Sequence, residues 1–319
     1  MMRVAVLDDY QGVALQLADW PSLHPAAQIQ AFTDHLDDPT AIAQRLHTFE
    51  CVVLMRERTP FPRALFEKLP NLRLVITAGM RNASIDLAAA SERRVLVCGT
   101  DMLPYPTAEL TWGLILALSR HIPRDGQAMR EGHWQTTLGT GLKGKTLGLL
   151  GLGRLGGQVA RIGQAFGMTP IAWSQNLTAE RAAEAGAALV SREDLFARAD
   201  VVSVHLVLSA RTRGLVGAAD FARMKRTAYF INTSRGPIVD EAALVSALRD
   251  HRIAGAGIDV FEPEPVAPDH PLLALDNVVL TPHLGYVTEE NYRLLYGQAV
   301  EDIRAFLDGK VLRGINQLG

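Results

Sequence analysis

The sequence predicts an α/β protein with two domains, each built on a doubly wound parallel sheet. With 319 residues the chain is too long for one ordinary α/β core and suits two domains of about 100–200 residues each. Short apolar runs alternate with helix-length segments in two separate series, which is typical of consecutive β-α-β units. A glycine motif near the start of the second series indicates a turn from a strand into a helix.

The first series occupies the N-terminal hundred residues. Its helices have ordinary start signals, because Pro39 opens one helical segment and Asp86 precedes another. Strands spaced by helices in this way predict a parallel sheet. The expected strands are VAVL at 4–7, QIQAF at 28–32, CVVLM at 51–55, LRLVIT at 72–77 and VLVC at 95–98.

A second series begins at Thr146 and predicts a second doubly wound sheet. Between the two series, residues 106–132 start with a proline and have helical apolar spacing, so they predict a long connecting helix with a break near Pro123. The expected strands of the second sheet are TLGLL at 146–150, TPIAW at 169–173, VVSVHLVL at 201–208, AYFIN at 228–232, AGAGIDV at 254–260 and VVLTP at 278–282.

The segment after His283 is helical again and ends at Gly309. Too little chain follows it to form another domain, so we expect this helix to pack back towards the first sheet. The first domain should therefore join residues 1–100 with residues 285–319, and the second domain should span residues 101–284. No internal repeat or low-complexity tract interrupts this arrangement.

The glycine motif reads GLGRLG, with Gly151, Gly153 and Gly156 in G-x-G-x-x-G spacing after an apolar run. Gly151 allows a sharp turn, Gly153 leaves room for a pyrophosphate, and Gly156 lets the helix pack against the strand. The amides and the positive dipole end of the helix would then hold phosphate anions. Because the chain has 27 glycines, the spacing alone is weak evidence, and its position between strand and helix makes it a predicted dinucleotide site.

A second phosphate motif is rejected. Residues 139–146, GTGLKGKT, match the phosphate loop of nucleoside triphosphatases. A working loop of that kind leaves a strand and opens a helix, whereas here a polar loop precedes the motif and a strand follows it. ATP or GTP hydrolysis is therefore not expected.

Composition excludes several other classes. The 32 Lys and Arg residues balance 34 Asp and Glu residues, so no global charge attracts nucleic acid or an anionic membrane. Cys51 and Cys98 lie in apolar runs without a C-x-x-C partner, which favours buried free thiols in a reducing compartment. No secretory signal, membrane span or metal-ligand cluster is recognisable. We expect a cytoplasmic protein without a metal.

Three polar residues follow strands of the second sheet and are candidates for catalysis: Arg235, Glu264 and His283. Ligands bind open α/β sheets beyond the carboxyl ends of the strands. Arg235 offers a planar fork of donors for a carboxylate, and His283 can move a proton near neutral pH. A carboxylate beside His283 would favour the protonated imidazole. Each residue alone could equally be structural or solvent-facing, and the other histidines, including His205, are interpreted as structural.

Four motifs occur in order: GLGRLG, NTSRGPIVDEAAL, GIDVFEPEP and TPHLGYVT. Together they resemble the D-isomer-specific 2-hydroxyacid dehydrogenases, and the resemblance runs through essentially the whole chain. It implies a Rossmann cofactor domain inserted into a flavodoxin-like substrate domain, and a homodimer built around the connecting helix. It also implies that Arg235 orients the 2-oxoacid, that His283 is the proton donor, and that Glu264 supports His283.

The resemblance further assigns cofactor and substrate contacts. Asp259 falls on the position that contacts the nicotinamide carboxamide, and the loop containing Gly79 supplies backbone amides to the substrate carboxylate. The implied cofactor-binding residues are Gly151, Gly153, Arg154, Leu155, Gly156, Ser174, Thr233, Ser234, Arg235, Asp259, His283 and Gly285. The implied substrate-binding residues are Gly79, Met80, Arg81, Asn82 and Arg235.

The sequence departs from the family pattern at the ribose-binding position. An acid is expected at the end of the second strand of the cofactor sheet, where it binds the ribose hydroxyls and repels a 2′-phosphate. Ser174 stands there, followed by Gln175 and Asn176, and no arginine follows directly. NAD and NADP both remain open, with a slight preference for NADP tolerance. The stretch VCGTDMLPYPTAEL also lacks the Asn and Pro-Gly that the family commonly has there.

The sequence thus predicts an NAD(P)-dependent oxidoreductase that acts on a small 2-oxoacid or D-2-hydroxyacid. One alternative is an NAD(H)-sensing regulatory protein on the same fold. The other is a formate or phosphonate dehydrogenase, although formate enzymes have Gln where Glu264 stands. The individual substrate stays open, because Arg56, Arg58 and Arg81 could hold a substrate phosphate or could simply be solvated.

Overall fold

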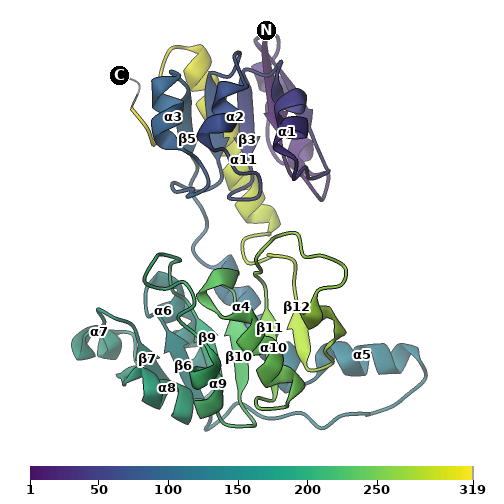
Figure 1. Ribbon diagram of the computed structural model, residues 1–319, viewed down its shortest axis with the longest axis vertical. Helices are drawn as coiled ribbons and strands as arrows, with labels where there is room; N and C mark the ends of the chain where they lie inside the picture. The colour runs from purple at the N-terminus through teal and green to yellow at the C-terminus, as the bar shows by residue number, and fades with distance from the viewer. Residues whose placement is uncertain (318–319) are drawn as a thin grey trace. The chain divides into compact units, whose positions relative to one another are not determined.

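The computed structural model describes residues 1–317, and the chain divides into two compact units. The first unit contains Met1–Leu103 and the segment from Val287 onward, and the second unit is Pro104–Tyr286. Figure 1 shows the purple N-terminal strands and the yellow C-terminal helix in the same unit. The chain therefore leaves the first unit, builds the whole of the second, and returns.

The first unit contains a five-stranded sheet. Its strand order is β2-β1-β3-β4-β5 and all neighbours are parallel, which is the doubly wound order of flavodoxin-like folds. The strands are β1 (Met2–Val6), β2 (Ala27–Ala31), β3 (Cys51–Leu54), β4 (Leu74–Thr77) and β5 (Leu96–Gly99). The helices are α1 (Pro39–Leu46), α2 (Arg63–Glu67), α3 (Leu87–Glu92) and α11 (Glu289–Leu307), with short 3-10 turns at Ala14–Gln16 and Trp20–Leu23.

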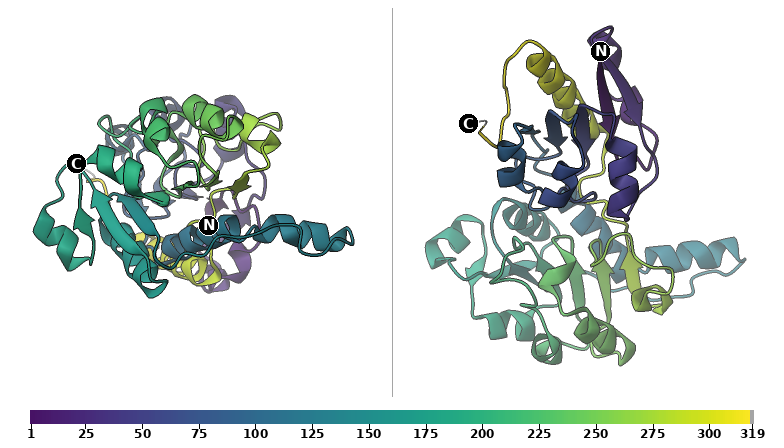
Figure 2. Two further views of the ribbon diagram at one scale, coloured as in Figure 1. Left: turned by 90° about the horizontal axis from the view of Figure 1, so that it is seen from below. Right: turned by 45° about the horizontal axis from the view of Figure 1, so that its top comes forward.

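Helices cover both faces of this sheet. Side chains such as Val52 and Val75 form a core with α1, α2 and α3 on one face. Helix α11 covers the other face, where Tyr296 is fully buried and its ring centroid lies 6.1 Å from that of Trp20. Figures 1 and 2 show this layering. The alternation of buried side chains along each strand explains the layering, since successive residues point to opposite faces.

The segment after α11 pairs with the edge strand β5. Gly99 donates its N–H to the carbonyl of Arg313, and Ile315 donates its N–H to the carbonyl of Val97. The side chain of Asn316 accepts a hydrogen bond from the N–H of Val97 over 2.8 Å. This antiparallel addition satisfies backbone groups that would otherwise be exposed at one edge of the sheet.

The second unit contains a seven-stranded sheet. Its order is β12-β11-β10-β9-β6-β7-β8, again entirely parallel. The strands are β6 (Thr146–Leu150), β7 (Thr169–Trp173), β8 (Ala188–Leu189), β9 (Val201–Val204), β10 (Tyr229–Asn232), β11 (Gly255–Ile258) and β12 (Val278–Leu280). The order reverses between β6 and β9, and such a switch point is where doubly wound sheets bind ligands.

Two cores lie on opposite faces of this sheet. Along β10, Phe230 joins the core with α8 (Arg192–Arg198), α9 (Ala218–Arg223) and α10 (Glu241–Arg249), whereas Tyr229 and Ile231 join the core with α4 (Pro106–Ser119) and α6 (Arg154–Ala165). A further short helix, α7 (Ala179–Glu184), precedes β8. The predicted fold class, two parallel α/β domains, is confirmed.

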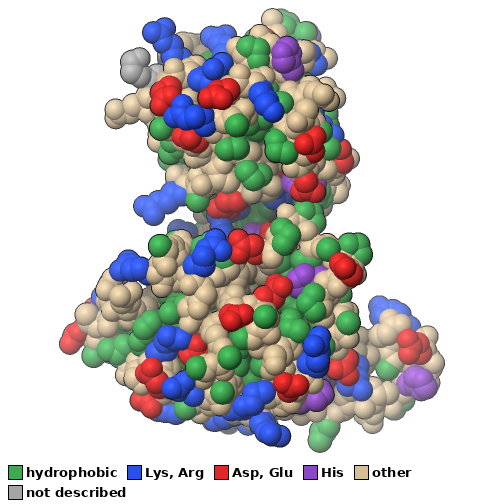
Figure 3. All heavy atoms as spheres, viewed as in Figure 1, with side chains coloured by type: hydrophobic (Ala, Val, Ile, Leu, Met, Phe, Trp, Pro, Cys, Tyr) green, Lys and Arg blue, Asp and Glu red, His purple; other side chains and the backbone are tan. Residues whose placement is uncertain are grey.

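The connecting segment forms two helices, α4 and α5 (Ile122–Arg130). The break falls at His121, which has a left-handed backbone with φ 51°, so Pro123 lies in the first turn of the new helix. Helix α5 has no buried residue and stands out as an arm from the body of its unit (Figures 1 and 3).

Two details differ from the sequence-based expectation. The strand expected at 201–208 ends at Val204, since the chain then leaves the sheet and Val207 is 82% exposed. Strand β8 was not expected, because its two residues are both exposed and carry no apolar pattern. Among the described residues, no helix is long and apolar enough to cross a bilayer.

Candidate active site

The glycine turn follows β6 at the switch point of the second unit. Gly151 has φ +95°, and a Cβ there would lie 2.6 Å from the carbonyl oxygen of His205. A Cβ on Gly156 would lie 2.2 Å from the carbonyl oxygen of Gly151, so both positions require glycine. A Cβ on Gly153, in contrast, would meet nothing within 4 Å. The turn is therefore tight inside and open outside, as a pyrophosphate cradle must be.

The open side faces the start of α6. The first backbone hydrogen bond of this helix runs from the N–H of Gly157 to the carbonyl of Gly153. The amides of Arg154, Leu155 and Gly156 precede that bond and belong to the positive end of the helix dipole. Arg154 is exposed and Leu155 is half-buried. This end of α6 suits an anionic dinucleotide.

The loop after β10 carries Arg235. Asn232, which is 2% exposed, accepts the N–H of Ser234 over 3.1 Å and donates to the carbonyl of Arg235 over 3.0 Å, so its side chain closes the loop. The hydroxyl of Ser234 donates to the carbonyl of Leu206 in the loop after β9. Arg235 Nη1 donates to the carbonyl of Ser234 over 2.8 Å.

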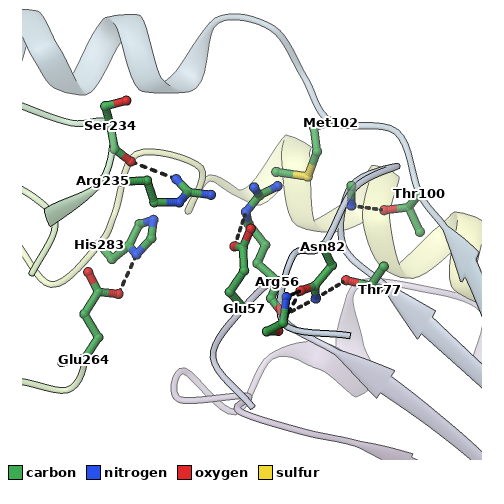
Figure 4. A network of polar contacts seen from close by, with 12 residues as sticks. Arg56, Glu57, Thr77, Asn82, Thr100, Met102, Ser234, Arg235, Glu264 and His283 are labelled. Atoms are coloured by element: carbon green, nitrogen blue, oxygen red, sulfur yellow. Dashed lines mark hydrogen bonds and ion pairs between the residues drawn. The ribbon is translucent and has the colours of Figure 1, made fainter. Parts of the chain in front are cut away.

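Thr233, in the same loop, points elsewhere. Its hydroxyl lies 2.8 Å from that of Thr111 on α4, and both residues are buried. The loop that carries Arg235 is therefore fixed to the connecting helix as well as to its own strand. Figure 4 shows Ser234, Arg235 and His283 close together in the second unit.

His283 and Glu264 form a close pair. Nδ1 of His283 lies 2.6 Å from Oε2 of Glu264, and Oε1 of Glu264 accepts the N–H of Phe261 over 2.7 Å (Figure 4). The His283 ring meets Tyr286 edge-on, with centroids 5.5 Å apart. The imidazole side chain is 18% exposed and the carboxylate 29% exposed. Because Nδ1 is engaged by Glu264, Nε2 is the nitrogen left to exchange a proton with a ligand.

Asp259 holds the loop that carries His283. Its carboxylate is fully buried and accepts three bonds: from the Thr281 hydroxyl at 2.6 Å, from the Leu284 N–H at 2.7 Å and from the Gly285 N–H at 2.9 Å. Burial raises the pKa of Asp259, and these donors oppose the rise. The backbone of His283 is left-handed at φ 54°, a conformation that needs such support.

Gly285 closes this loop from the other side. Its carbonyl accepts the hydroxyl of Thr107 on α4 over 2.8 Å. A Cβ on Gly285 would lie 3.1 Å from Oδ2 of Asp259, so a larger residue would press on the buried carboxylate. The connecting helix therefore supports both the Arg235 loop and the His283 loop.

Ser174 follows β7 directly and is half-buried, while Gln175 and Asn176 are exposed. The N–H of Gly151 donates to the carbonyl of Trp173, so this strand end lies beside the glycine turn. From Glu131 to Glu180 the sequence contains no other acidic residue. The strand end at Ser174 and the helix that follows the glycine turn therefore contribute no negative side chain to the predicted cofactor site.

His205 belongs to the structural residues of this region. Desolvation lowers the pKa of its imidazole to about 4, so the ring is neutral at pH 7. Its Nε2 lies 2.9 Å from the hydroxyl of Ser203, and its carbonyl touches Gly151. It shapes the glycine turn instead of moving protons.

The residues expected to bind the substrate carboxylate lie in the first unit, in the loop after β4. Gly79 has φ +89° and its N–H is 3.2 Å from the hydroxyl of Thr100. The side chain of Asn82 is buried, where it donates to the carbonyl of Arg56 over 2.7 Å and to the hydroxyl of Thr77 over 2.9 Å (Figure 4). Asn82 thus fixes the shape of the loop, and the amides of Met80 and Arg81 form its open part.

Arg56 lies against this loop. A Cβ on Gly79 would be 2.8 Å from Nη1 of Arg56, and Nε of Arg56 lies 3.4 Å from Oε2 of Glu57. Arg58 donates to the carbonyl of Asp8 over 3.0 Å, and its guanidinium lies 4.5 Å from the ring centroid of Tyr10. The sequence left open that Arg56 and Arg58 are simply solvated. In the structure both guanidinium groups have protein partners.

Some residues of the site escape sequence reasoning. Asn232 shapes the Arg235 loop, Thr111 supports that loop from α4, and Thr107 supports the His283 loop from the same helix. The two threonines belong to none of the four quoted motifs. Asn232 is the last residue of β10 and the first of the motif NTSRGPIVDEAAL, and this position is the one available signal for its role. Within residues 1–317 no group of three or more His, Cys, Asp or Glu side chains could hold a metal ion.

Comparison with known proteins identifies the family of the chain. Residues 112–285 match the model of the D-isomer specific 2-hydroxyacid dehydrogenase, NAD binding domain. Glyoxylate reductase from Aeropyrum pernix is 43% identical over 257 residues, covering 77% of each chain. The crystal structure of phosphoglycerate oxidoreductase from Vibrio cholerae O395 has a TM-score of 0.92 and 38% identity, covering 97% of this chain and 100% of that one.

D-3-phosphoglycerate dehydrogenase from Methanocaldococcus jannaschii is 38% identical over 268 residues. This match covers 83% of the chain but only 51% of that relative, so the chain spans about half its length. The matched residues 112–285 include the four ordered motifs of the sequence, GLGRLG, NTSRGPIVDEAAL, GIDVFEPEP and most of TPHLGYVT. The chain belongs to the D-isomer specific 2-hydroxyacid dehydrogenases, a family of NAD(P)-dependent oxidoreductases.

Proposed function

We propose that the protein reduces a small 2-oxoacid to the D-2-hydroxyacid, or catalyses the reverse reaction, with Arg235, Glu264 and His283 as its catalytic residues. The observation that carries this proposal is the 2.6 Å contact between His283 and Glu264 in the unit that also presents Arg235 and the glycine turn. A histidine paired with a carboxylate is suited to general acid–base catalysis. Arg235 supplies the cation that a 2-oxoacid carboxylate requires.

The nicotinamide dinucleotide, when bound at the glycine turn, supplies the hydride that reaches C2 of the oxoacid. Arg235 holds the carboxylate through its guanidinium fork and fixes the orientation of the carbonyl. His283 gives the proton on Nε2 to the carbonyl oxygen, which becomes the hydroxyl of the product. Glu264 stabilises the imidazolium before transfer and sets the direction of the ring through Nδ1. In the oxidation direction His283 takes the hydroxyl proton.

We assign the remaining cofactor contacts to the second unit. The amides of Arg154, Leu155 and Gly156 suit the pyrophosphate, and the loop at Ser174 suits the adenosine ribose. Asp259 and Gly285 keep the His283 loop in place. In the first unit, the amides of Met80 and Arg81 are proposed to bind the substrate carboxylate, and Gly79 and Asn82 to shape that loop.

NADP is proposed as an acceptable cofactor alongside NAD. Ser174, Gln175 and Asn176 carry no negative charge to repel a 2′-phosphate, and no acid lies between Glu131 and Glu180. Arg154, at the start of α6 after the glycine turn, adds a positive charge at this end of the sheet.

A homodimer built around the connecting helix is also proposed. Helix α5 and the segment after it expose several large apolar side chains, which a monomer would leave in water. These are Ile122 at 56%, Met129 at 59%, Trp134 at 75% and Leu138 at 93% exposure. Both cysteines, Cys51 and Cys98, are free and buried, which supports a reducing compartment such as the cytoplasm.

The proposal is tested by turnover of glyoxylate, hydroxypyruvate, pyruvate and branched 2-oxoacids with NADH and NADPH, followed by loss of reduced-nicotinamide absorbance. The wild-type protein should turn over at least one of these acids. His283→Ala should lower kcat by about 10²–10⁴-fold, which is the usual contribution of a general acid. Nucleotide binding without turnover of any acid would favour the sensing alternative, and unchanged kcat in His283→Ala would remove the role of His283.

A further inference from the structure

The segment that carries Glu264, residues 261–270, is mostly exposed between its two ends. Three of its ten residues are prolines, and its central residues are exposed apart from the half-buried Glu264 and Val266. Val266 packs against the core of the unit, and the remaining support for the position of the segment comes from its two ends. The position matters, because Glu264 must meet Nδ1 of His283 at 2.6 Å.

The first end is held by backbone contact. A Cβ on Gly236 would lie 2.5 Å from the carbonyl carbon of Phe261 and 2.6 Å from its carbonyl oxygen. Gly236 begins the 3-10 turn η3 (Gly236–Ile238) that directly follows Arg235. The backbone of the Arg235 loop at Gly236 therefore packs directly against the backbone of the Glu264 segment at Phe261, with no room for a side chain between them. Phe261 also donates its N–H to Glu264 itself.

The second end is held by His270. Its ring meets the ring of Phe261 edge-on, with centroids 5.8 Å apart and planes at 83°. Its Nε2 lies 3.0 Å from Oε1 of Glu241, the first residue of α10. The imidazole is 10% exposed, whereas the Glu241 carboxylate is 39% exposed. The N–H of Leu272 donates to Nδ1, which leaves Nε2 as the donor to Glu241.

These contacts form a closed path through the unit. Helix α10 comes shortly after the Arg235 loop, so Glu241 is fixed relative to Gly236. His270 joins Glu241 to Phe261, and Phe261 bonds to Glu264. The two ends of the exposed segment are thus tied to the same short stretch of chain that presents Arg235.

We infer that His270 is a positioning residue for Glu264: through Glu241 and Phe261 it holds the segment 261–270 where Glu264 reaches His283. The inference rests on the proposed role of Glu264, but the contact itself is measurable without turnover. His270 touches neither substrate nor cofactor in this scheme. Its effect passes entirely through the carboxylate of Glu264.

The test is the imidazole titration of His283 in the full-length protein, followed by ¹⁵N NMR and assigned with His283→Gln. Loss of the carboxylate contact removes a charge that favours the protonated ring, so Glu264→Gln should move the midpoint to lower pH. His270→Leu removes both the ring contact and the bond to Glu241, and it should move the midpoint in the same direction. In the Glu264→Gln background it should add nothing, since coupled residues are not additive.

Kinetics supply a second readout. His270→Leu should lower kcat several-fold and shift the acid-dependent limb of the reduction profile to lower pH, with KM for the oxoacid changed less than twofold. His270→Gln, which keeps an N–H donor for Glu241, should restore part of both effects. The matched control is Glu262→Gln on the same segment: Glu262 is exposed and forms an ion pair with exposed Arg213 at 2.9 Å. It should leave the titration unchanged.

An unchanged His283 titration in His270→Leu would overturn the inference. So would a shift of equal size in the Glu264→Gln background, because His270 would then act by another route. If His270→Leu does not fold, Glu241→Gln and His270→Gln carry the same two comparisons. A wild-type protein that reduces no 2-oxoacid, yet shows the expected titration pattern, would refute the proposed function and leave this inference standing.

Discussion

At the scale of single residues, the site is set by carboxylates with different surroundings. Asp259 is fully buried, and its carboxylate oxygens accept hydrogen bonds from the loop 281–285. Glu264 is partly exposed and faces the imidazole of His283. Burial raises the pKa of Asp259, so its ionised form depends on the three donors around it. The resemblance implied a nicotinamide contact for Asp259, and its present bonds all go to the chain itself.

The candidate catalytic residues could be found from the sequence because each follows a strand and belongs to a motif. Arg235 comes three residues after β10, and His283 three residues after β12. The contacts of Asn232 and His270 could not be found in this way. They depend on which loops meet in space, and a lone Asn or His carries no spacing that reports such a meeting.

Ser174 gives a prediction about cofactor choice. Ser174→Asp places a carboxylate at the strand end beside the glycine turn, where it can accept the ribose hydroxyls and repel a 2′-phosphate. We expect the Kd for NADPH to rise by at least tenfold relative to that for NADH, measured by calorimetric titration. Ser174→Asn is the matched neutral control and should leave the ratio nearly unchanged. Equal effects on both nucleotides would show that Ser174 lies away from the 2′-position.

At the scale of elements, the apolar pattern of the sequence predicts where each strand lies, but it predicts the residue at which a strand ends less accurately. The run TPIAW coincides with β7, since all three of its central residues are buried. The run VVSVHLVL is apolar throughout but leaves the sheet after Val204, because the glycine turn packs against the carbonyl of His205. Hydrophobicity alone does not distinguish a buried strand residue from one that lines a turn.

The loop after β4 gives a prediction about substrate binding. Gly79→Ala places a methyl group 2.8 Å from Arg56 Nη1 at a residue with φ +89°, so the loop is strained and either the loop or the Arg56 side chain must shift. We expect KM for the 2-oxoacid to rise about tenfold with unchanged Kd for the nucleotide, because the glycine turn lies in the other unit. Gly132→Ala is the matched control, since Gly132 has φ +86° with open space around it. A KM equal in both variants would contradict the role of the loop.

The pairing of the C-terminal segment with β5 buries an acid. Asp302 on α11 has a fully buried side chain, and Arg313 Nε lies 3.3 Å from it. Burial raises the pKa of Asp302 from 3.8 to about 6, against the influence of Arg313. A carboxyl whose folded pKa lies above its unfolded value contributes stability below the unfolded pKa, and this contribution is lost as pH rises through the folded pKa.

Asp302→Asn should therefore change the pH dependence of unfolding between pH 4 and 6. Over this window the wild-type free energy of unfolding should fall relative to that of the variant by at most about 3 kcal/mol. Urea unfolding at pH 4, 5, 6 and 7, followed by circular dichroism, measures the difference. Asp308→Asn on the same helix end serves as the control and should run parallel to the wild type. A constant offset between Asp302→Asn and wild type would rule out titration of Asp302 in this range.

At the scale of the whole molecule, the second unit is an insertion in the first, and the helix that leads into it ends in an arm. The sequence indicates the insertion. A glycine motif opens a second series of strands, and the C-terminal helix after His283 is followed by too little chain to form a domain of its own. It does not indicate the arm. Residues 122–130 have helical spacing like any packed helix, and only the structure shows that none of them is buried.

The arm gives a prediction about assembly. Trp134 and Leu138 are 75% and 93% exposed, and Ile122 and Met129 on α5 are also exposed, so the arm and the segment after it present several large apolar side chains to water. The wild-type protein should elute at twice the chain mass of 34.7 kDa in size exclusion with light scattering. Trp134→Lys with Leu138→Lys places two charges on this surface and should give the monomer mass, because buried unpaired charges prevent association. Val311→Lys, at a residue 56% exposed in the first unit, is the control and should leave the mass unchanged. A double variant that keeps the dimer mass would place the interface elsewhere, and a monomeric wild type would remove the proposal that the arm is a dimer contact.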